Sequence, residues 1–229
     1  MSEIHNELNV IKQTLMNKSD LVIFDVGGCD FNDACHFKHY FPQSQVFSFE
    51  PDEFNLRTYK NRADQMGVIV VPVALSDNND EVDFYPSISY NGNTHKASGS
   101  TLKPNVKPGT SEGIHHDGLL YDLDGYKVQI VRLDTFCELN NINHIDYLHM
   151  DVQGAEKRVL NGIGNLRPSF IFAETCEFTT YDSGHDKQEF DMFMYELGYE
   201  IIHEFRDDTL YKRKDAFVDF VAPTWLDKL

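Results

Sequence analysis

Acidic side chains stand at the ends of four short apolar runs, where the strands of a sheet would meet a ligand. They are Asp25, Glu50, Asp151 and Glu174. In an open α/β sheet, ligands bind beyond the carboxyl ends of the strands, near the point where the strand order reverses. Carboxylates gathered there can accept hydrogen bonds from hydroxyl groups, pair with a cation or take up a proton. The pattern therefore predicts a site for a polar ligand that carries hydroxyls or positive charge.

A pair of glycines follows the first of these acids. Gly27 and Gly28 allow a tight turn and a close approach of the backbone to a ligand. Glu50 lies 25 residues after Asp25, near the spacing at which an acid accepts hydrogen bonds from the ribose of a nucleotide. The pyrophosphate motif G-x-G-x-x-G is absent, because the two glycines are adjacent and no third glycine follows. S-adenosylmethionine, which carries an ammonium and a sulfonium, therefore fits this segment better than NAD.

The elements that would position these residues alternate along the chain. Apolar or β-branched runs predict strands, and apolar residues three or four positions apart predict helices. The predicted strands are 21–24, 46–49, 68–75, 81–85, 128–131, 145–150, 169–173, 199–202 and 216–221, and the predicted helices are 4–16 (within an N-terminal helical segment 1–20), 32–41, 53–66, 133–140, 155–163 and 187–197. This alternation predicts one α/β domain over residues 1–229, with a doubly wound, mostly parallel Rossmann-like sheet and helices on both faces.

Residues 86–126 interrupt this alternation. The segment is rich in Gly, Ser, Asn, Pro and His and shows little periodicity. Because long loops inside compact domains often serve function, we expect an insertion that acts as a lid over the site. Within it, His115 and His116 are candidate substrate contacts or simply solvated side chains. The segment Ser98–Thr101 is either a source of hydrogen bonds to cofactor or substrate, or a flexible turn.

The charge balance favours a small polar ligand. The chain has 37 acidic and 20 basic residues and a formal net charge of −17, which repels nucleic-acid phosphates and anionic lipid head groups. The short basic run Lys212–Lys214 is expected in a solvated turn between strands. The four cysteines form no C-x-x-C pair, and no apolar stretch resembles a signal peptide or a membrane span. These features predict a cytoplasmic protein with reduced cysteines, no nucleic-acid partner and no membrane contact; they do not indicate an oligomeric state.

Six segments together resemble the FkbM family of methyltransferases. They lie in order over residues 21–177: Phe24–Gly28, Phe49–Pro51, Val73–Ser76, Val131–Asp134, Asp146–Glu156 and Val159–Gly162. The most specific part is Asp151-Val-Gln-Gly-Ala-Glu156 followed by Val159-Leu-Asn-Gly162. The resemblance implies S-adenosylmethionine as cofactor and O-methylation of a hydroxyl on a natural product, sugar or glycolipid.

By position, the resemblance also implies cofactor-binding roles for eight residues. The methionine part would lie against Asp25, Gly27 and Gly28, the ribose against Glu50, the adenine against Ala74, Leu75 and Ser76, and the methionine or the reacting centre against Asp151.

The sequence departs from the family pattern at three positions. The family usually has glycine, lysine and glutamate where this chain has Phe31, His149 and Gln153. Phe31 would tighten the turn that faces the cofactor. His149 and Gln153 would remove a charge pair, which indicates a different substrate or base.

Methyl transfer to oxygen needs an aligned acceptor and a group that takes the hydroxyl proton. His149 and Asp151 are the candidate bases, although His149 could instead be hydrogen-bonded only to its neighbours. Glu174 is a candidate substrate contact. An alternative that we do not favour is that Glu174 and Asp151 hold Mg²⁺ for a pair of acceptor hydroxyls.

Two other functions stay open at this point. The three departures are consistent with a non-catalytic module that binds S-adenosylmethionine without turnover. The glycine turn and Glu50 are also compatible with an NAD-dependent oxidoreductase, which the missing pyrophosphate motif disfavours.

Overall fold

The computed structural model describes residues 10–11, 15, 18–94, 96–105, 113–114, 119–175 and 186–215. Most of the predicted helix 4–16, the predicted strand 216–221, and both His115 and His116 lie outside the described residues. Within the first of these segments, Val10, Ile11 and Leu15 are helical and buried against the domain.

Seven strands form the main sheet. In spatial order they are β13 (Tyr199–Glu204), β14 (Asp208–Arg213), β12 (Phe170–Glu174), β11 (Tyr147–Met150), β1 (Val22–Val26), β2 (Gln45–Phe49) and β3 (Ile69–Val71). The strands from β12 to β3 pair in parallel, and β14 is antiparallel to both its neighbours. From β1 the chain builds outward through β2 and β3, and then returns to the other side of β1 as β11. The strand order therefore reverses between β1 and β11, where a ligand site is expected.

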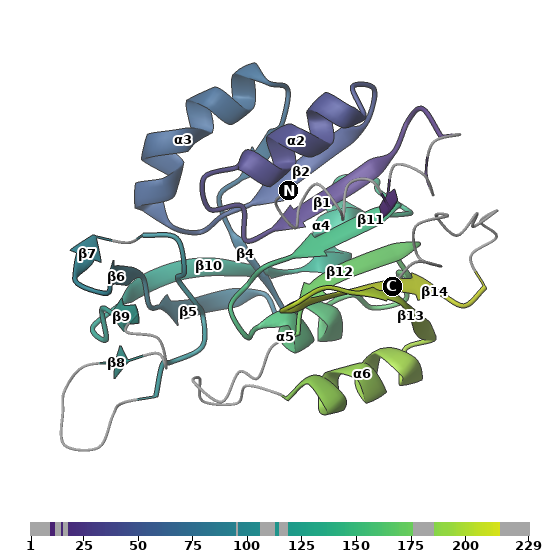
Figure 1. Cartoon of the computed structure of the whole chain (residues 1–229). Helices are drawn as coiled ribbons and strands as arrows, with labels where there is room; N and C mark the ends of the chain where they lie inside the picture. The colour runs from purple at the N-terminus through teal and green to yellow at the C-terminus, as the bar shows by residue number, and fades with distance from the viewer. Residues whose placement is uncertain are drawn as a thin grey trace.

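Helices cover both faces of this sheet. Figure 1 shows α2 (Asn32–Tyr40) and α3 (Glu53–Gln65) on one side, and α5 (Glu156–Asn161) and α6 (Lys187–Glu196) on the other. Successive side chains of β1 enter different cores, as the period of a strand requires. Phe24 packs with Leu133 of α4 (Leu133–Leu139) and with residues of α5 and α6, whereas Ile23 packs with Phe37 of α2. The predicted doubly wound α/β architecture is confirmed.

The predicted strand 68–75 is wrong in extent, because the chain forms two short strands there. β3 ends at Val71, and β4 (Ala74–Ser76) pairs in parallel with β10 (Tyr126–Arg132) in a second sheet, whose other member is the antiparallel β5 (Asp80–Phe84). Pro72 stands at the break. Proline has no N–H to donate to a ladder, so it ends the pairing with β2 and lets the chain change sheets.

Residues 86–126, predicted as a long and partly ordered insertion, include short strands that the sequence did not predict. The segment contributes a four-stranded sheet in the order β7 (Asn93–Thr94), β6 (Ser87–Tyr90), β9 (Leu119–Tyr121) and β8 (Gly113–Ile114). Strands of two to four residues are too short to show alternation. Figure 1 places this sheet beside β5 and β10, away from β13 and β14.

The basic run at 212–214 does not lie in a turn between strands as predicted. Lys212 and Arg213 are the last residues of β14, and only Lys214 lies in the turn that follows. Leu210 and Tyr211 are buried in the middle of this strand. The flanking charged residues concealed its apolar centre.

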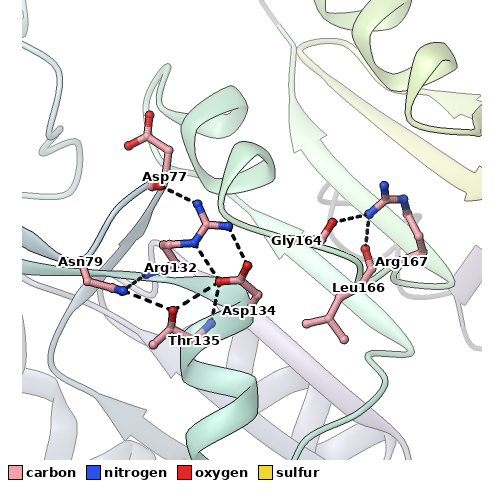
Figure 2. Close-up of polar contacts among 8 residues, drawn as sticks. All are labelled: Asp77, Asn79, Arg132, Asp134, Thr135, Gly164, Leu166 and Arg167. Carbon is pink, nitrogen blue, oxygen red and sulfur yellow. Dashed lines mark hydrogen bonds and ion pairs between the residues drawn. The ribbon is translucent and has the colours of Figure 1, made fainter.

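A polar cluster holds the second sheet against α4 (Figure 2). The guanidinium of Arg132 donates two hydrogen bonds to the carboxylate of Asp134, at 2.9 and 2.6 Å, and a third to the backbone carbonyl of Asp77, at 2.7 Å. The backbone N–H of Arg132 donates to Asn79 Oδ1 at 2.8 Å. Because Asp77 follows β4 directly, this cluster fixes the end of β4, which carries residues implied to contact the adenine.

Candidate active site

A narrow cleft opens at the switch point of the main sheet. It holds about 530 Å³ of space, part of which is open to solvent. Its walls come from the ends of four strands and from the insertion, and include Gly27 after β1, Glu50 after β2, Leu75 in β4, Asp151 after β11 and Ser100. Residues far apart in the sequence therefore meet where the topology predicts a ligand.

Gly27 brings the end of β1 against the segment that follows β11. Its φ is +91°, and a Cβ atom there would overlap the backbone carbonyl oxygen of Asp151. The N–H groups of Gly27 and Gly28 both donate to the carbonyl of Phe49 at 3.0 Å, which joins the ends of β1 and β2. Only glycine satisfies both the conformation and the close approach.

Gly28 and Phe31, which follow in the turn, face the core. Gly28 is not among the cleft-lining residues; a Cβ there would overlap Ser48 Oγ and approach the ring of Phe31. Phe31 begins α2 in a left-handed conformation, with φ of 61°, and is fully buried in the core beneath that helix. The phenyl ring, at the position where the resembling family has glycine, is therefore in the core and does not line the cleft. Cys29, also left-handed at φ 47°, lines the cleft in its place.

Glu50 is held at the end of β2 by backbone donors. Its carboxylate accepts the N–H of Cys29 at 2.7 Å and the N–H of Asp52 at 2.6 Å. Burial raises the pKa of Glu50 to about 8, although these two bonds and a side-chain hydrogen bond from Asn55 act in the opposite direction. Asp52 in turn caps α3 through its side chain. The carboxylate is thus rigidly positioned and faces the cleft.

Asp25 and His149 form a buried pair behind the cleft. They are register partners on β1 and β11, with His149 Nδ1 3.1 Å from Asp25 Oδ1. Ser48 Oγ donates to the other oxygen of Asp25 at 2.5 Å. The ring of His149 stacks on Phe172, with centroids 5.1 Å apart and an interplanar angle of 11°. Neither Asp25 nor His149 is among the cleft-lining residues.

Asp151 ends β11 at the open side of the cleft, where a glutamine links it to Glu174 at the end of β12. Gln153 Nε2 donates to Asp151 Oδ1 at 2.8 Å and to Glu174 Oε2 at 2.9 Å. Ser100 Oγ donates a hydrogen bond to the backbone carbonyl of Gln153 at 3.0 Å. Gln153 and Ser100 line the cleft with Asp151. The link brings Asp151 and Glu174 together, as expected of acids on adjacent strand ends.

The loop between β11 and α5 is supported from below by Glu156. This fully buried carboxyl accepts the N–H groups of Val152 at 3.2 Å and Gly154 at 3.3 Å. Burial raises the pKa of Glu156 to about 8.

The three residues implied to contact the adenine are placed differently. Ala74 and Leu75 line the cleft, whereas Ser76 is buried outside it. A Cβ at Gly162 would overlap the backbone carbonyl oxygen of Ser76. The glycine of the Val159–Gly162 segment therefore lets α5 approach β4.

Comparison with known proteins decides the family. A family model described as a methyltransferase FkbM domain matches residues 25–201. This chain belongs to the FkbM methyltransferase family. The 2-O-methyltransferase NoeI of Sinorhizobium fredii is 32% identical over 177 residues, which cover 74% of this chain and 69% of NoeI.

Two further proteins are similar to this chain at lower sequence identity. Methyltransferase 1 of Beauveria bassiana is 26% identical over 172 residues, which cover 70% of this chain and 66% of that protein. Among solved structures, a precorrin-6y C5,15-methyltransferase from Geobacter metallireducens aligns with a TM-score of 0.45 and 10% identity over 89% of this chain and 83% of that one.

Membership in the FkbM family makes the chain a methyltransferase and implies S-adenosylmethionine as its methyl donor. The cleft fits that donor. It offers a buried carboxylate at Glu50 for hydroxyl groups, a carboxylate at Asp151 for positive charge, and a buried amide oxygen on Asn55. The family match also argues against the alternative function of an NAD-dependent oxidoreductase.

The sequence reasoning missed Cys29 and Asn55, which line the cleft, and it named Gln153, a third lining residue, only as a departure from the family pattern. Asn55 could have been found from its position five residues after Glu50, in the first turn of a predicted helix. In the described ranges, no group of three or more His, Cys, Asp or Glu residues could hold a metal ion. None of the described helices is long and apolar enough to cross a bilayer.

Proposed function

We propose that this FkbM methyltransferase transfers a methyl group from S-adenosylmethionine to a hydroxyl of a sugar, a glycan or another small molecule. The observation that carries the proposal is the cleft in which Gly27, Glu50 and Asp151 meet. The relative NoeI, a 2-O-methyltransferase, supports oxygen as the acceptor atom.

Each wall of the cleft is assigned one part of the donor. Glu50 accepts hydrogen bonds from the ribose, and Ala74 and Leu75 pack against the adenine. Gly27 leaves room for the methionine part, whose charged groups lie near Asp151. Asp25 and Gly28 act indirectly, by fixing the glycine turn through Ser48.

The chemistry that the chain must supply is alignment and proton removal. When bound, S-adenosylmethionine supplies a methyl group already activated on a cationic sulfur, so that its C–S bond breaks as the new C–O bond forms. Asp151 accepts the hydroxyl proton of the acceptor, and Gln153 holds this carboxylate in place by donating to Oδ1. Glu174, on the other side of Gln153, contacts a neighbouring acceptor hydroxyl.

The negative charge at the ends of β11 and β12 selects the class of acceptor. Asp151 and Glu174 place two carboxylates around a neutral amide. They repel an anionic acceptor and accept hydrogen bonds from hydroxyls, which favours a neutral polyhydroxyl compound. The predictions of a cytoplasmic location and of no nucleic-acid partner remain predictions.

His149 is assigned a supporting role, because it lies in the core with Asp25 and Phe172. Two variants test this division. Asp151→Asn should lower kcat by about 10²-fold or more with little change in Tm. His149→Asn should lower Tm and leave kcat within a few-fold.

The assay follows S-adenosylhomocysteine release with neutral sugars, oligosaccharides and phenols as acceptors. Asp122→Asn and His144→Asn, both at exposed positions outside the cleft, are the matched controls. Loss of turnover in His149→Asn at an unchanged Tm, with full activity in Asp151→Asn, would reverse the two roles. Binding of S-adenosylhomocysteine without turnover on any acceptor would support the non-catalytic alternative.

A further inference from the structure

Asn55 carries a polar atom that the folded protein leaves unsatisfied. It lies in the first turn of α3, is 4% exposed and lines the cleft beside Glu50. Its Oδ1 is buried and has no hydrogen-bond partner in the described part of the chain. Burying an unpaired carbonyl costs on the order of 1–3 kcal/mol. A group with this cost at the wall of a cleft indicates a ligand that donates a hydrogen bond to it.

The neighbouring carboxylate determines which way the amide faces. Asn55 makes a side-chain hydrogen bond to Glu50, and this bond lowers the pKa of Glu50. A carboxylate only accepts, so the NH₂ group of the amide must point toward it. Asn55 Oδ1 therefore points away from Glu50.

The acceptor capacity of Glu50 is nearly used within the protein. A carboxylate offers about four acceptor positions. The N–H groups of Cys29 and Asp52 and the amide of Asn55 occupy three of them. One position remains, whereas a ribose presents two adjacent hydroxyls.

We propose that Asn55 is a second ribose-binding residue, whose Oδ1 accepts a hydrogen bond from one ribose hydroxyl while Glu50 accepts one from the other. This inference rests on the proposed function, because it assumes that the ribose of the donor lies at Glu50. The amide thus satisfies Glu50 on one side and the ribose on the other. An aspartate at this position would instead set a second negative charge against the buried carboxylate.

The side chain of Asn55 can be changed without removing the helix cap. Asp52 Oδ1 accepts the backbone N–H groups of Phe54 at 2.6 Å and Asn55 at 3.3 Å, which any residue supplies. Asn55→Leu is therefore the test variant, since leucine is similar in size and has no acceptor. Asn61→Leu, at an exposed position on the same helix, is the control.

Calorimetric titration with S-adenosylhomocysteine measures the effect. Asn55→Leu should raise Kd about 10- to 100-fold, and Asn61→Leu should leave it unchanged. In the ligand-free protein Asn55→Leu removes the unsatisfied oxygen and also the hydrogen bond from the amide to Glu50, so these two effects oppose each other and the Tm should change little. A residue with a merely structural role would show a lower Tm instead.

Analogues that lack one ribose hydroxyl identify the contact. Between the 2′-deoxy and 3′-deoxy forms of S-adenosylhomocysteine, the form that lacks the hydroxyl bound by Asn55 should bind the natural protein about tenfold more weakly. The same form should lose nothing further with Asn55→Leu. The comparison of the two deoxy forms on the natural protein is valid even if Asn55→Leu does not fold. In that case Asn55→Ser replaces Asn55→Leu as the test variant.

The outcomes separate the two proposals. If the natural protein does not bind S-adenosylhomocysteine at all, the proposed function fails. Two results would overturn the role of Asn55 and leave the proposed function standing. The first is that the natural protein binds S-adenosylhomocysteine and Asn55→Leu binds it with a Kd within twofold of the natural value. The second is that the loss of each ribose hydroxyl raises Kd by the same factor in both proteins.

Discussion

At the residue scale, the glycine turn can be separated into a conformational and a steric requirement. Gly27 and Gly198 have nearly the same φ, +91° and +92°. A Cβ at Gly27 would overlap the carbonyl oxygen of Asp151, whereas a Cβ at Gly198 would meet nothing within 4 Å. Comparing Gly27 with Gly198 therefore separates the effect of the close approach between the ends of β1 and β11 from the effect of the positive φ.

Alanine at each of these two positions gives the first prediction. Gly198→Ala should destabilise the protein by about 1 kcal/mol through φ strain alone and leave Kd for S-adenosylhomocysteine unchanged. Gly27→Ala should cost at least 2 kcal/mol more, because the backbone at Asp151 must shift, and should raise Kd at least tenfold. Urea unfolding and calorimetry measure the two effects. Equal stability and equal Kd for both variants would show that the approach at Gly27 is not needed.

Gln153 gives the second prediction at this scale. Its amide donates to both Asp151 and Glu174, and glutamate in its place has no hydrogen to donate at neutral pH. Gln153→Glu should therefore lower kcat about tenfold, because Asp151 loses its donor and gains a repelling neighbour. Gln129→Glu is the control, since Gln129 also donates to a carboxylate, that of Glu81, on the exposed face of β10. Unchanged kcat in both variants would contradict the positioning role of Gln153.

At the element scale, the sequence predicts most of the strands and helices but not the face to which each side chain points. All five residues of β1 are buried, so its pattern lacks the alternation that distinguishes two faces. Asp25 and Gly27 are two positions apart, as are His149 and Asp151, so strand alternation predicts the same face for both residues of each pair. The point where each strand ends decides which of the two reaches the cleft. In the structure Asp25 and His149 share the face beneath α2, one register step away from the cleft.

The parts of the site that the sequence predicts best are those fixed by topology. Glu50, Asp151 and Glu174 come together because parallel strands end at one edge of a sheet. Asn55 and Gln153 depend on hydrogen bonds between loops, which no local pattern specifies. The split of residues 68–75 at Pro72 depends on which partner strand each half finds, and that partner, β10, follows about 50 residues later.

The clamp between β4 and α4 gives a prediction at this scale. Arg132 and Asp134 are each 30% exposed and form two parallel hydrogen bonds (Figure 2). Lysine cannot make this two-pronged contact and also reach the carbonyl of Asp77. Arg132→Lys should destabilise the protein by about 1–2 kcal/mol. It should also weaken S-adenosylhomocysteine binding a few-fold, because the end of β4 is released.

The control for the clamp is an exposed pair on α3. Arg57 and Glu53 are 80% and 67% exposed, so Arg57→Lys should change stability by less than about 0.5 kcal/mol. Urea unfolding compares the two variants. A clamp that contributes no more than this surface pair would give equal unfolding midpoints.

At the scale of the whole molecule, the site concentrates buried acids in a protein that already carries a net charge of −17. Glu50 and Glu156 are both buried, and burial raises the pKa of each to about 8. In the unfolded chain both would titrate near 4.5. Burial therefore shifts both carboxyls toward the protonated form in the folded state, and at Glu50 the hydrogen bonds donated by Cys29, Asp52 and Asn55 oppose this shift.

The sign of the pH dependence follows from this difference. Below about pH 4.5 both states are protonated and neither group affects stability. Between about pH 4.5 and 8 the unfolded chain releases protons that the folded protein keeps, so stability falls as pH rises. Each group contributes at most about 1.4 kcal/mol per pH unit to this slope. Above about pH 8 the contribution stays constant.

Glu156→Gln removes one of these two contributions while leaving an oxygen to accept the N–H groups of Val152 and Gly154. The variant should match the natural protein near pH 4.5 and become progressively more stable than it up to about pH 8, measured by urea unfolding at several pH values. Repulsion among the surface acids affects both proteins alike, so the difference between them isolates Glu156. Glu53→Gln, at an exposed position, should run parallel to the natural protein. If Glu156→Gln also runs parallel, then Glu156 is ionised in the folded state and the loop after β11 rests on a buried negative charge.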